Sequence, residues 1–266
     1  MSESWWQPRR LLMAALGALT VFYLLAPTLV IVPMSFTQAR ILSFPPEGFS
    51  LQWYQRMVTD PQWAAGIQHS AQVAVLTAVV ATTLGTLAAL GLSRARRFPG
   101  RTLVNALALS PLIVPVVVIA IGMFGLFVQW RIAGSLIGLV VAHTALALPF
   151  VIVNVGTSLR TMDRNLELAA ANLGADPRRS FQHVTLPIIL PGVLAGAIFS
   201  FITSWDEVVV AIFMTSARFR TLPVEMWEQV RQVVDPTVAA VSTTLLVVTT
   251  TLLVLLFVVR RQAPAQ

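Results

Sequence analysis

The sequence contains no cysteine and no lysine, and only 11% of its 266 residues are charged. Without cysteine, there is no disulfide, zinc-thiolate site or haem-attachment motif. Without lysine, there is no Walker A phosphate-binding loop and no Schiff-base chemistry. Any energy that the protein uses must therefore come from elsewhere.

Hydrophobic residues make up 56% of the chain. A soluble domain, which usually has roughly a quarter of its residues charged, cannot hide so much apolar surface. Six apolar stretches are each long enough to cross a hydrocarbon core of about 30 Å as a helix. They cover approximately residues 11–36, 70–92, 103–128, 134–159, 187–215 and 238–259. We expect Pro111 and Pro115 to kink the third. We therefore predict an all-α, polytopic membrane protein with six transmembrane helices in one domain over residues 1–266.

All 18 basic residues are arginines, and the net charge is +7. They lie mainly in short loops beside the predicted spans, which indicates membrane topology rather than nucleic-acid binding. Twelve lie at the two ends of the chain and in the loops after the second and fourth spans, whereas six lie in the alternate loops. This excess predicts that both termini and the loop at residues 160–186 face the cytoplasm, with the loops at residues 37–69 and 216–236 outside.

Each external loop is expected to contain a short helix. In the first loop, Ser50 can cap a helix that carries Trp53 and Tyr54. In the second, residues 223–230 have apolar residues at helical spacing, and Asp235 can then cap the last span. These segments are predicted to lie at the outer surface of the membrane.

The loop at residues 160–186 has strong local signals. Residues 162–173 contain many good helix formers, and Gly174 is placed to end that helix. Asp176 can cap a second short helix that begins at Pro177. The pattern predicts two short helices in an L shape, which run into the next span and form a docking surface.

The same loop carries a spaced motif. Ala169 and Ala170 are followed after three residues by Gly174, and after nine more by Val-Thr-Leu-Pro at residues 184–187. This pattern resembles the cytoplasmic signature of permease subunits of ATP-binding-cassette importers, which reads Glu-Ala-Ala, three residues, Gly, nine residues, Ile-x-Leu-Pro. In such permeases the loop couples the membrane helices to an ATPase, and we refer to residues 160–186 as the coupling loop.

One position departs from the signature. Its glutamate falls on Leu168, and the neighbouring Glu167 is the candidate for its acidic role, although residues one apart point about 100° apart on a helix. The residues that the resemblance assigns to ATPase coupling are Glu167, Ala169, Ala170, Gly174, Ala175, Asp176, Pro177, Leu186 and Pro187, with Pro187 at the start of the next span.

The resemblance covers nearly the whole chain and includes residues 44–50, 204–207 and 220–227, where the chain is similar to the second permease subunit of the spermidine/putrescine branch. It implies the type I importer fold in a bacterial inner membrane. It also implies a homologous permease partner in a heterodimer, two cytoplasmic ATPases that bind ATP and magnesium, and a periplasmic or lipid-anchored binding protein. The chain itself would hold no catalytic residue, metal or cofactor, and would contact membrane lipid but no nucleic acid.

The implied cargo is a small cation such as putrescine or spermidine, with an opine, another amine or an organic acid as alternatives. Trp205, Asp206 and Glu207 are candidates for the cargo path. The two acids fall in the predicted fifth span, where an ionised carboxylate costs about 2.5 to 3.5 kcal/mol. Their charge favours a cation, on which Trp205 is suited to stack. The structural alternative is a buried ion pair or a helix end near the outer interface.

Two other classes of protein are alternatives. An intramembrane serine protease needs a serine and a histidine within reach, and Ser110 and His143 lie on adjacent predicted spans. However, no oxyanion hole is indicated, and His143 is more typical of a hydrogen bond between helices. A channel or secondary transporter is the stronger alternative, because acids within the membrane also serve ion coupling. No inverted repeat is evident.

Overall fold

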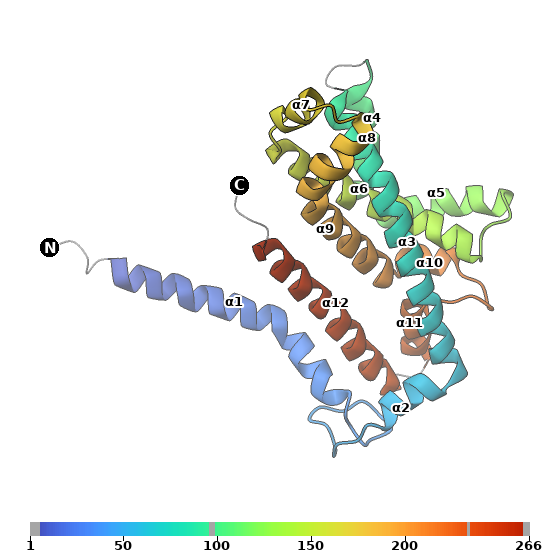
Figure 1. Cartoon of the computed structure of the whole chain (residues 1–266). Coiled ribbons are helices and arrows are strands. Elements are labelled where there is room, and N and C mark those ends of the chain that lie inside the picture. The colour runs from blue at the N-terminus through green and yellow to red at the C-terminus, as the bar shows by residue number, and fades with distance from the viewer. Residues whose placement is uncertain (1–5, 96–98, 233–234, 263–266) are drawn as a thin grey trace. The chain divides into compact units, whose positions relative to one another are not determined.

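The computed structural model describes residues 6–95, 99–232 and 235–262 (Figure 1). Arg96 and Arg97, which contribute to the predicted orientation, lie outside these ranges, as do two residues of the second external loop. The described residues form helices and no strand, which confirms the predicted all-α class. The helices are α1 (Trp6–Met34), α2 (Gln52–Thr59), α3 (Pro61–Arg94), α4 (Arg101–Leu109), η1 (Ser110–Leu112), α5 (Val116–Gln129), α6 (Leu136–Thr161), α7 (Asn165–Asn172), α8 (Pro177–Ser180), η2 (Phe181–Thr185), α9 (Leu186–Trp205), α10 (Val209–Met214), α11 (Leu222–Gln232) and α12 (Thr237–Gln262).

Five stretches of helix within the described ranges are long and apolar enough to cross a membrane, and the bent pair of α4–η1 and α5 gives a sixth candidate. This agrees with the six predicted spans, but the third is not one kinked helix. The helix axis bends by 104° between its two halves. The break lies at Pro115, whose ψ of 130° is extended rather than helical, and a proline cannot donate the hydrogen bond that would continue the first half.

The second predicted span starts nine residues too late, because α3 begins at Pro61 rather than at Ser70. The polar residues at its start are satisfied by the segment that contains the second external helix. Gln62 Nε2 donates to Glu225 Oε2 at 2.8 Å, and His69 Nδ1 lies 2.9 Å from the carbonyl oxygen of Arg220. The expected helix at 223–230 is found as α11, but its first four residues are buried instead of lying on the surface.

The contacts among the described residues divide the chain into two units, residues 1–60 with 228–246 and residues 61–227 with 247–266. In the smaller unit, one of the two predicted caps is present. Asp235 Oδ1 accepts a hydrogen bond from the Thr237 amide at 2.8 Å. Ser50 Oγ accepts one from the Gln52 amide at 3.1 Å, but the N-cap position of α2 is occupied by Leu51, so Ser50 lies one residue before the predicted cap. Asp235 also forms an ion pair with Arg56 at 2.7 Å, which ties the start of α12 to α2.

The larger unit is built on α3, α6 and α9, which pack against one another. Their crossing depends on small residues. A Cβ atom at Gly85 would lie 2.6 Å from Cβ of Val151, and one at Gly196 would lie 3.0 Å from Cα of the same valine. In a membrane, such residues let helix backbones approach closely. This three-helix core holds the coupling loop at one end, where α7 and α8 lie (Figure 1), and the Asp206–Glu207 pair where α9 ends.

Candidate functional site

The turn of the coupling loop is a Schellman motif at the end of α7. The Ala175 amide donates to the carbonyl of Ala170 at 3.0 Å, and the Gly174 amide donates to that of Ala171 at 2.9 Å. Gly174 has a φ of +85°, which glycine adopts without the strain that a side chain brings. No atom lies within 4 Å of the position where its Cβ would be. The predicted C-cap is confirmed, and the turn is open to solvent or to a partner.

The second short helix also starts as predicted. Asp176 Oδ1 accepts a hydrogen bond from the Arg179 amide at 2.8 Å, and Pro177 occupies the first helical position. α9 begins at Leu186 with Pro187 in its first turn, close to the predicted start, and it continues directly from α8 and η2, so that one helical stretch runs from Pro177 to Trp205. η2 is a π-helical turn. This wider turn accommodates the ring of Pro187, which would collide with the carbonyl of residue i−4 in a regular α-helix.

Glu167 points toward its own chain. Its Oε1 accepts hydrogen bonds from the buried hydroxyl of Thr185 and, at 3.1 Å, from Nη2 of Arg94. The hydrogen bond from Thr185 is the main reason that the pKa of Glu167 lies below its usual value, and Arg94 adds to the effect. The carboxylate thereby links α7 to η2 and to the end of α3. We call this contact the Glu167 latch.

Leucines, rather than acids, form the outward surface of α7 and its turn. The exposed fractions of Leu168 and Leu173 are 62% and 89%. Sequence reasoning did not select either residue for the site, although the leucine at the glutamate position of the signature was the available signal. The other residues assigned to coupling differ in exposure. Ala169, Gly174, Asp176, Pro177 and Pro187 are exposed, and Ala170, Ala175 and Leu186 are half-buried.

Asp206 and Glu207 do not lie within a continuous helix. The predicted span at residues 187–215 is interrupted, because α9 ends at Trp205 and α10 begins at Val209. The carboxylate of Glu207 accepts hydrogen bonds from the first three amides of α10, at 3.0, 2.9 and 3.1 Å. Such capping satisfies amides that have no partner within the helix. At Asp206 and Glu207 the structure therefore contains a helix end, which is one of the structural alternatives named above.

The three candidates for the cargo path differ in exposure. Asp206 is exposed, and no hydrogen bond or ion pair of its carboxylate is found among the described residues. Trp205 is 7% exposed and stacks on Phe201, with a distance of 5.7 Å between the ring centroids. Glu207 is engaged with α10. Of the three, Asp206 has the carboxylate that is available to a ligand.

His143 bridges α6 to the end of α9. Its Nδ1 lies 2.8 Å from Oγ of Ser204, and its Nε2 lies 3.9 Å from Oε2 of Glu207. This confirms the expected hydrogen bond between helices. The pair that a serine protease would need is not formed, because Ser110 Oγ donates to the carbonyl of Leu107 at 2.8 Å instead.

Comparison with known proteins decides the family. Residues 81–264 match the family described as "Binding-protein-dependent transport system inner membrane component". The chain belongs to this family. It is 31% identical to the putrescine transport system permease protein PotI of Escherichia coli over 242 residues, which are 89% of this chain and 85% of PotI. It is 33% identical to the spermidine/putrescine transport system permease protein PotC of Escherichia coli over 221 residues, 83% of each chain.

Among solved structures, the chain is similar to a bacterial ABC transporter involved in the import of the acidic polysaccharide alginate. The TM-score is 0.72 at 15% sequence identity, over 99% of both chains. The likeness to this solved structure shows the fold. The family shows that the chain is the membrane component of a binding-protein-dependent transport system. The protein is a permease subunit of an ABC importer, with the predicted permease fold.

Proposed function

We propose that this permease carries a polyamine through the bacterial inner membrane, and that a partner ATPase drives it through the coupling loop. The observation that carries the proposal is the single helical stretch from Pro177 to Trp205, which starts in the coupling loop and ends next to Asp206. Its 29 residues correspond to about 43 Å, because an α-helix rises about 1.5 Å per residue. A displacement of the loop would therefore be transmitted to the acid pair without a flexible joint.

The coupling loop is suited to receive such a force. Its turn is fixed by the Schellman motif at Gly174, and its second helix is capped by Asp176. The Glu167 latch holds α7 against η2, so that α7 and α9 would move together. The exposed Leu168 and Leu173 would then enter an apolar groove on the ATPase. ATP and magnesium would bind to that ATPase, and this chain would have no hydrolytic site of its own.

Asp206 supports a cationic cargo. A polyamine loses part of its hydration in a narrow path, and a fixed negative charge compensates for this loss. Asp206 offers an exposed carboxylate, and the printed names of PotI and PotC refer to putrescine and spermidine. An opine, another amine or an organic acid is the alternative cargo. The remaining assembly would consist of a homologous permease, two ATPases and a periplasmic or lipid-anchored binding protein, with both termini of this chain in the cytoplasm.

Uptake by the complete importer in proteoliposomes tests the proposal. Labelled putrescine should accumulate only when the ATPase, ATP and the binding protein are present, and unlabelled spermidine should compete. Arginine, an opine and a dicarboxylate are the competitor panel. Competition by the dicarboxylate alone would assign an organic acid as cargo, and uptake without the ATPase would place the protein with channels or secondary transporters.

A further inference from the structure

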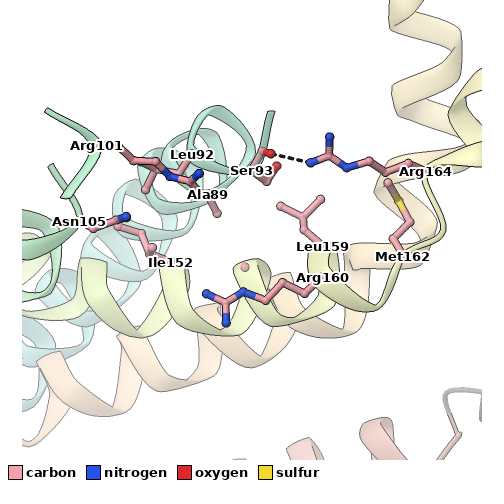
Figure 2. A pocket seen from close by; sticks show the side chains of 11 residues that line it. Ala89, Leu92, Ser93, Arg101, Asn105, Ile152, Leu159, Arg160, Met162 and Arg164 are labelled. Carbon is pink, nitrogen blue, oxygen red and sulfur yellow. Dashed lines mark hydrogen bonds between the residues drawn. The ribbon is translucent and has the colours of Figure 1, made fainter. Parts of the chain in front are cut away.

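A cavity of about 630 Å³ lies beside the base of the coupling loop (Figure 2). Its walls come from the end of α3, from α4, and from the end of α6 with the link that leads to α7. Neither the coupling surface of α7 nor the Asp206–Glu207 pair belongs to it. The proposed transport function therefore leaves this cavity unexplained.

Three arginines surround the cavity. Arg101 is the first residue of α4, Arg160 lies in the last turn of α6, and Arg164 precedes α7. Figure 2 shows Arg101 and Asn105 on one side of the cavity and Arg164 on the other. Nη2 of Arg164 donates to the carbonyl of Ser93 at 2.6 Å, which fixes this guanidinium at the edge of the cavity.

The charge of the cavity is not balanced by its own lining. None of its described lining residues is acidic. Of the nearby acids, Glu167 is hydrogen-bonded in the latch to Arg94 and Thr185 and interacts electrostatically with Arg164, and Asp163 accepts a hydrogen bond from the Asn165 amide at 2.9 Å. Three guanidinium groups around one concave space favour a ligand with several anionic oxygens, because a guanidinium donates paired hydrogen bonds to such groups.

The rest of the lining is apolar. Leu92, Ile152, Leu159 and Met162 line the cavity together with the arginines, and the last three are buried. A small hydrated anion gains nothing from such a surface, whereas a lipid places its glycerol and acyl groups against it. The combination of arginines and apolar residues in one cavity at the end of membrane helices matches an anionic headgroup that is attached to a chain.

We propose that the cavity binds the phosphate group of an anionic phospholipid. The arginines contact the phosphate oxygens, Asn105 donates from its amide, and the acyl chains leave along the apolar residues of α4. Leu103 and Leu107, both more than 60% exposed, follow Arg101 on that helix. The bound headgroup joins α4 to the end of α6 and so supports the base of the coupling loop. Free phosphate shares the chemistry of the headgroup and is the other possible source.

The test uses the full chain, purified in a neutral detergent and titrated in native mass spectrometry. The probes are phosphatidylglycerol, phosphatidylcholine and inorganic phosphate. We expect phosphatidylglycerol to bind at least tenfold more tightly than phosphatidylcholine, and inorganic phosphate to compete only weakly. Arg160→Gln should weaken phosphatidylglycerol binding about fivefold, which corresponds to about 1 kcal/mol for one arginine near an anionic lipid.

Arg178→Gln is the matched control, because Arg178 is an exposed arginine of the same loop that does not line the cavity. It should leave the affinity unchanged. A photoactivatable phosphatidylglycerol supplies a second measurement on the unaltered chain, and its crosslinks should map to residues 89–93, 101–105 and 152–164.

Several results would overturn the proposal. Equal binding of the two lipids, an equal effect of the Arg160 and Arg178 variants, or crosslinks confined to other segments would each do so. Binding of inorganic phosphate without phosphatidylglycerol would assign the cavity to a soluble ligand. Loss of lipid binding when the complete importer assembles would mean that a protein partner fills the cavity.

Discussion

Replacing Gly174 by valine tests whether the shape of the coupling loop matters for its contact with the ATPase. The φ of +85° at this position is left-handed, and an L-residue there costs about 1–2 kcal/mol, with β-branched residues the least suited. A Cβ at this position meets no other part of the chain within 4 Å, apart from its immediate neighbours. We therefore expect the effect to come mainly from backbone strain and from the partner's surface.

A cost of this size lowers the population of the native turn by a factor of about 5 to 30. The opening would be seen first at the Ala175 amide, whose hydrogen bond to Ala170 closes the Schellman motif. We expect its hydrogen exchange to accelerate by that factor. Co-purification of the ATPase and the ATP hydrolysis stimulated by the binding protein should both fall, while insertion into the membrane remains normal.

Gly91→Val is the matched control. Gly91 lies in α3, also has no atom within 4 Å of its Cβ position, and has no positive φ. It should leave the assembly unchanged, and Gly174→Asn should have an intermediate effect because asparagine tolerates the left-handed region better than valine. Accelerated exchange at Ala175 with normal ATPase binding and hydrolysis would refute the coupling role. Unchanged exchange would refute the argument from backbone conformation.

Three further predictions concern the latch, the acid pair and the helix crossing. Because the pKa of Glu167 is lowered, its contribution to loop stability is present above the usual pKa of 4.5 and is lost as the pH falls through the lowered value. The difference in thermal unfolding between the native chain and Glu167→Gln should shrink over that range, and a pH-independent difference would argue against an ionised latch. Asp206→Asn should reduce putrescine uptake severalfold without a loss of stability, whereas Glu207→Gln should cost about 0.5–2 kcal/mol of stability as a lost cap; equal behaviour in uptake and unfolding would contradict this division of roles. Gly85→Ala should destabilise by about 1–3 kcal/mol through overpacking, and the double variant with Val151→Gly, which removes the Cβ that lies 2.6 Å away, should lose less stability than the sum of the two single variants if the contact is the cause.

Local chemistry allowed the caps to be predicted. Gly174, Asp176 and Asp235 each act within a few residues of their own position, so neighbouring sequence contains all that is needed to place them. Hydropathy likewise located the apolar stretches. It failed at Pro115 because a continuous helix and a sharply bent pair have the same composition. The bend depends on a backbone angle that apolarity does not encode.

Contacts between distant residues were beyond the reach of sequence reasoning. The latch joins Glu167 to Arg94, which is 73 positions away, and to Thr185, which is 18 positions away. Nothing in the sequence pattern pairs these residues. Pro61 could begin α3 because Glu225, far along the chain, satisfies the polar start of that helix. The sequence predicts that Asp206 and Glu207 occupy two positions on one helix, whereas in the structure Glu207 caps the following helix, where its carboxylate accepts hydrogen bonds from otherwise unpaired amides.

The helix end at Trp205 explains how two adjacent acids are accommodated in this part of a membrane protein. Glu207 is stabilised by three amides of α10 and lies near His143 of α6, so its position depends on where α9 ends relative to both helices. Asp206 has no such support among the described residues and must rely on water or a ligand. A shift of α9, started at the coupling loop, would have to stretch the cap at Glu207 or carry α10 with it. Either response would change the surroundings of Asp206. We expect ATP hydrolysis by the partner ATPase to act on the cargo through this change.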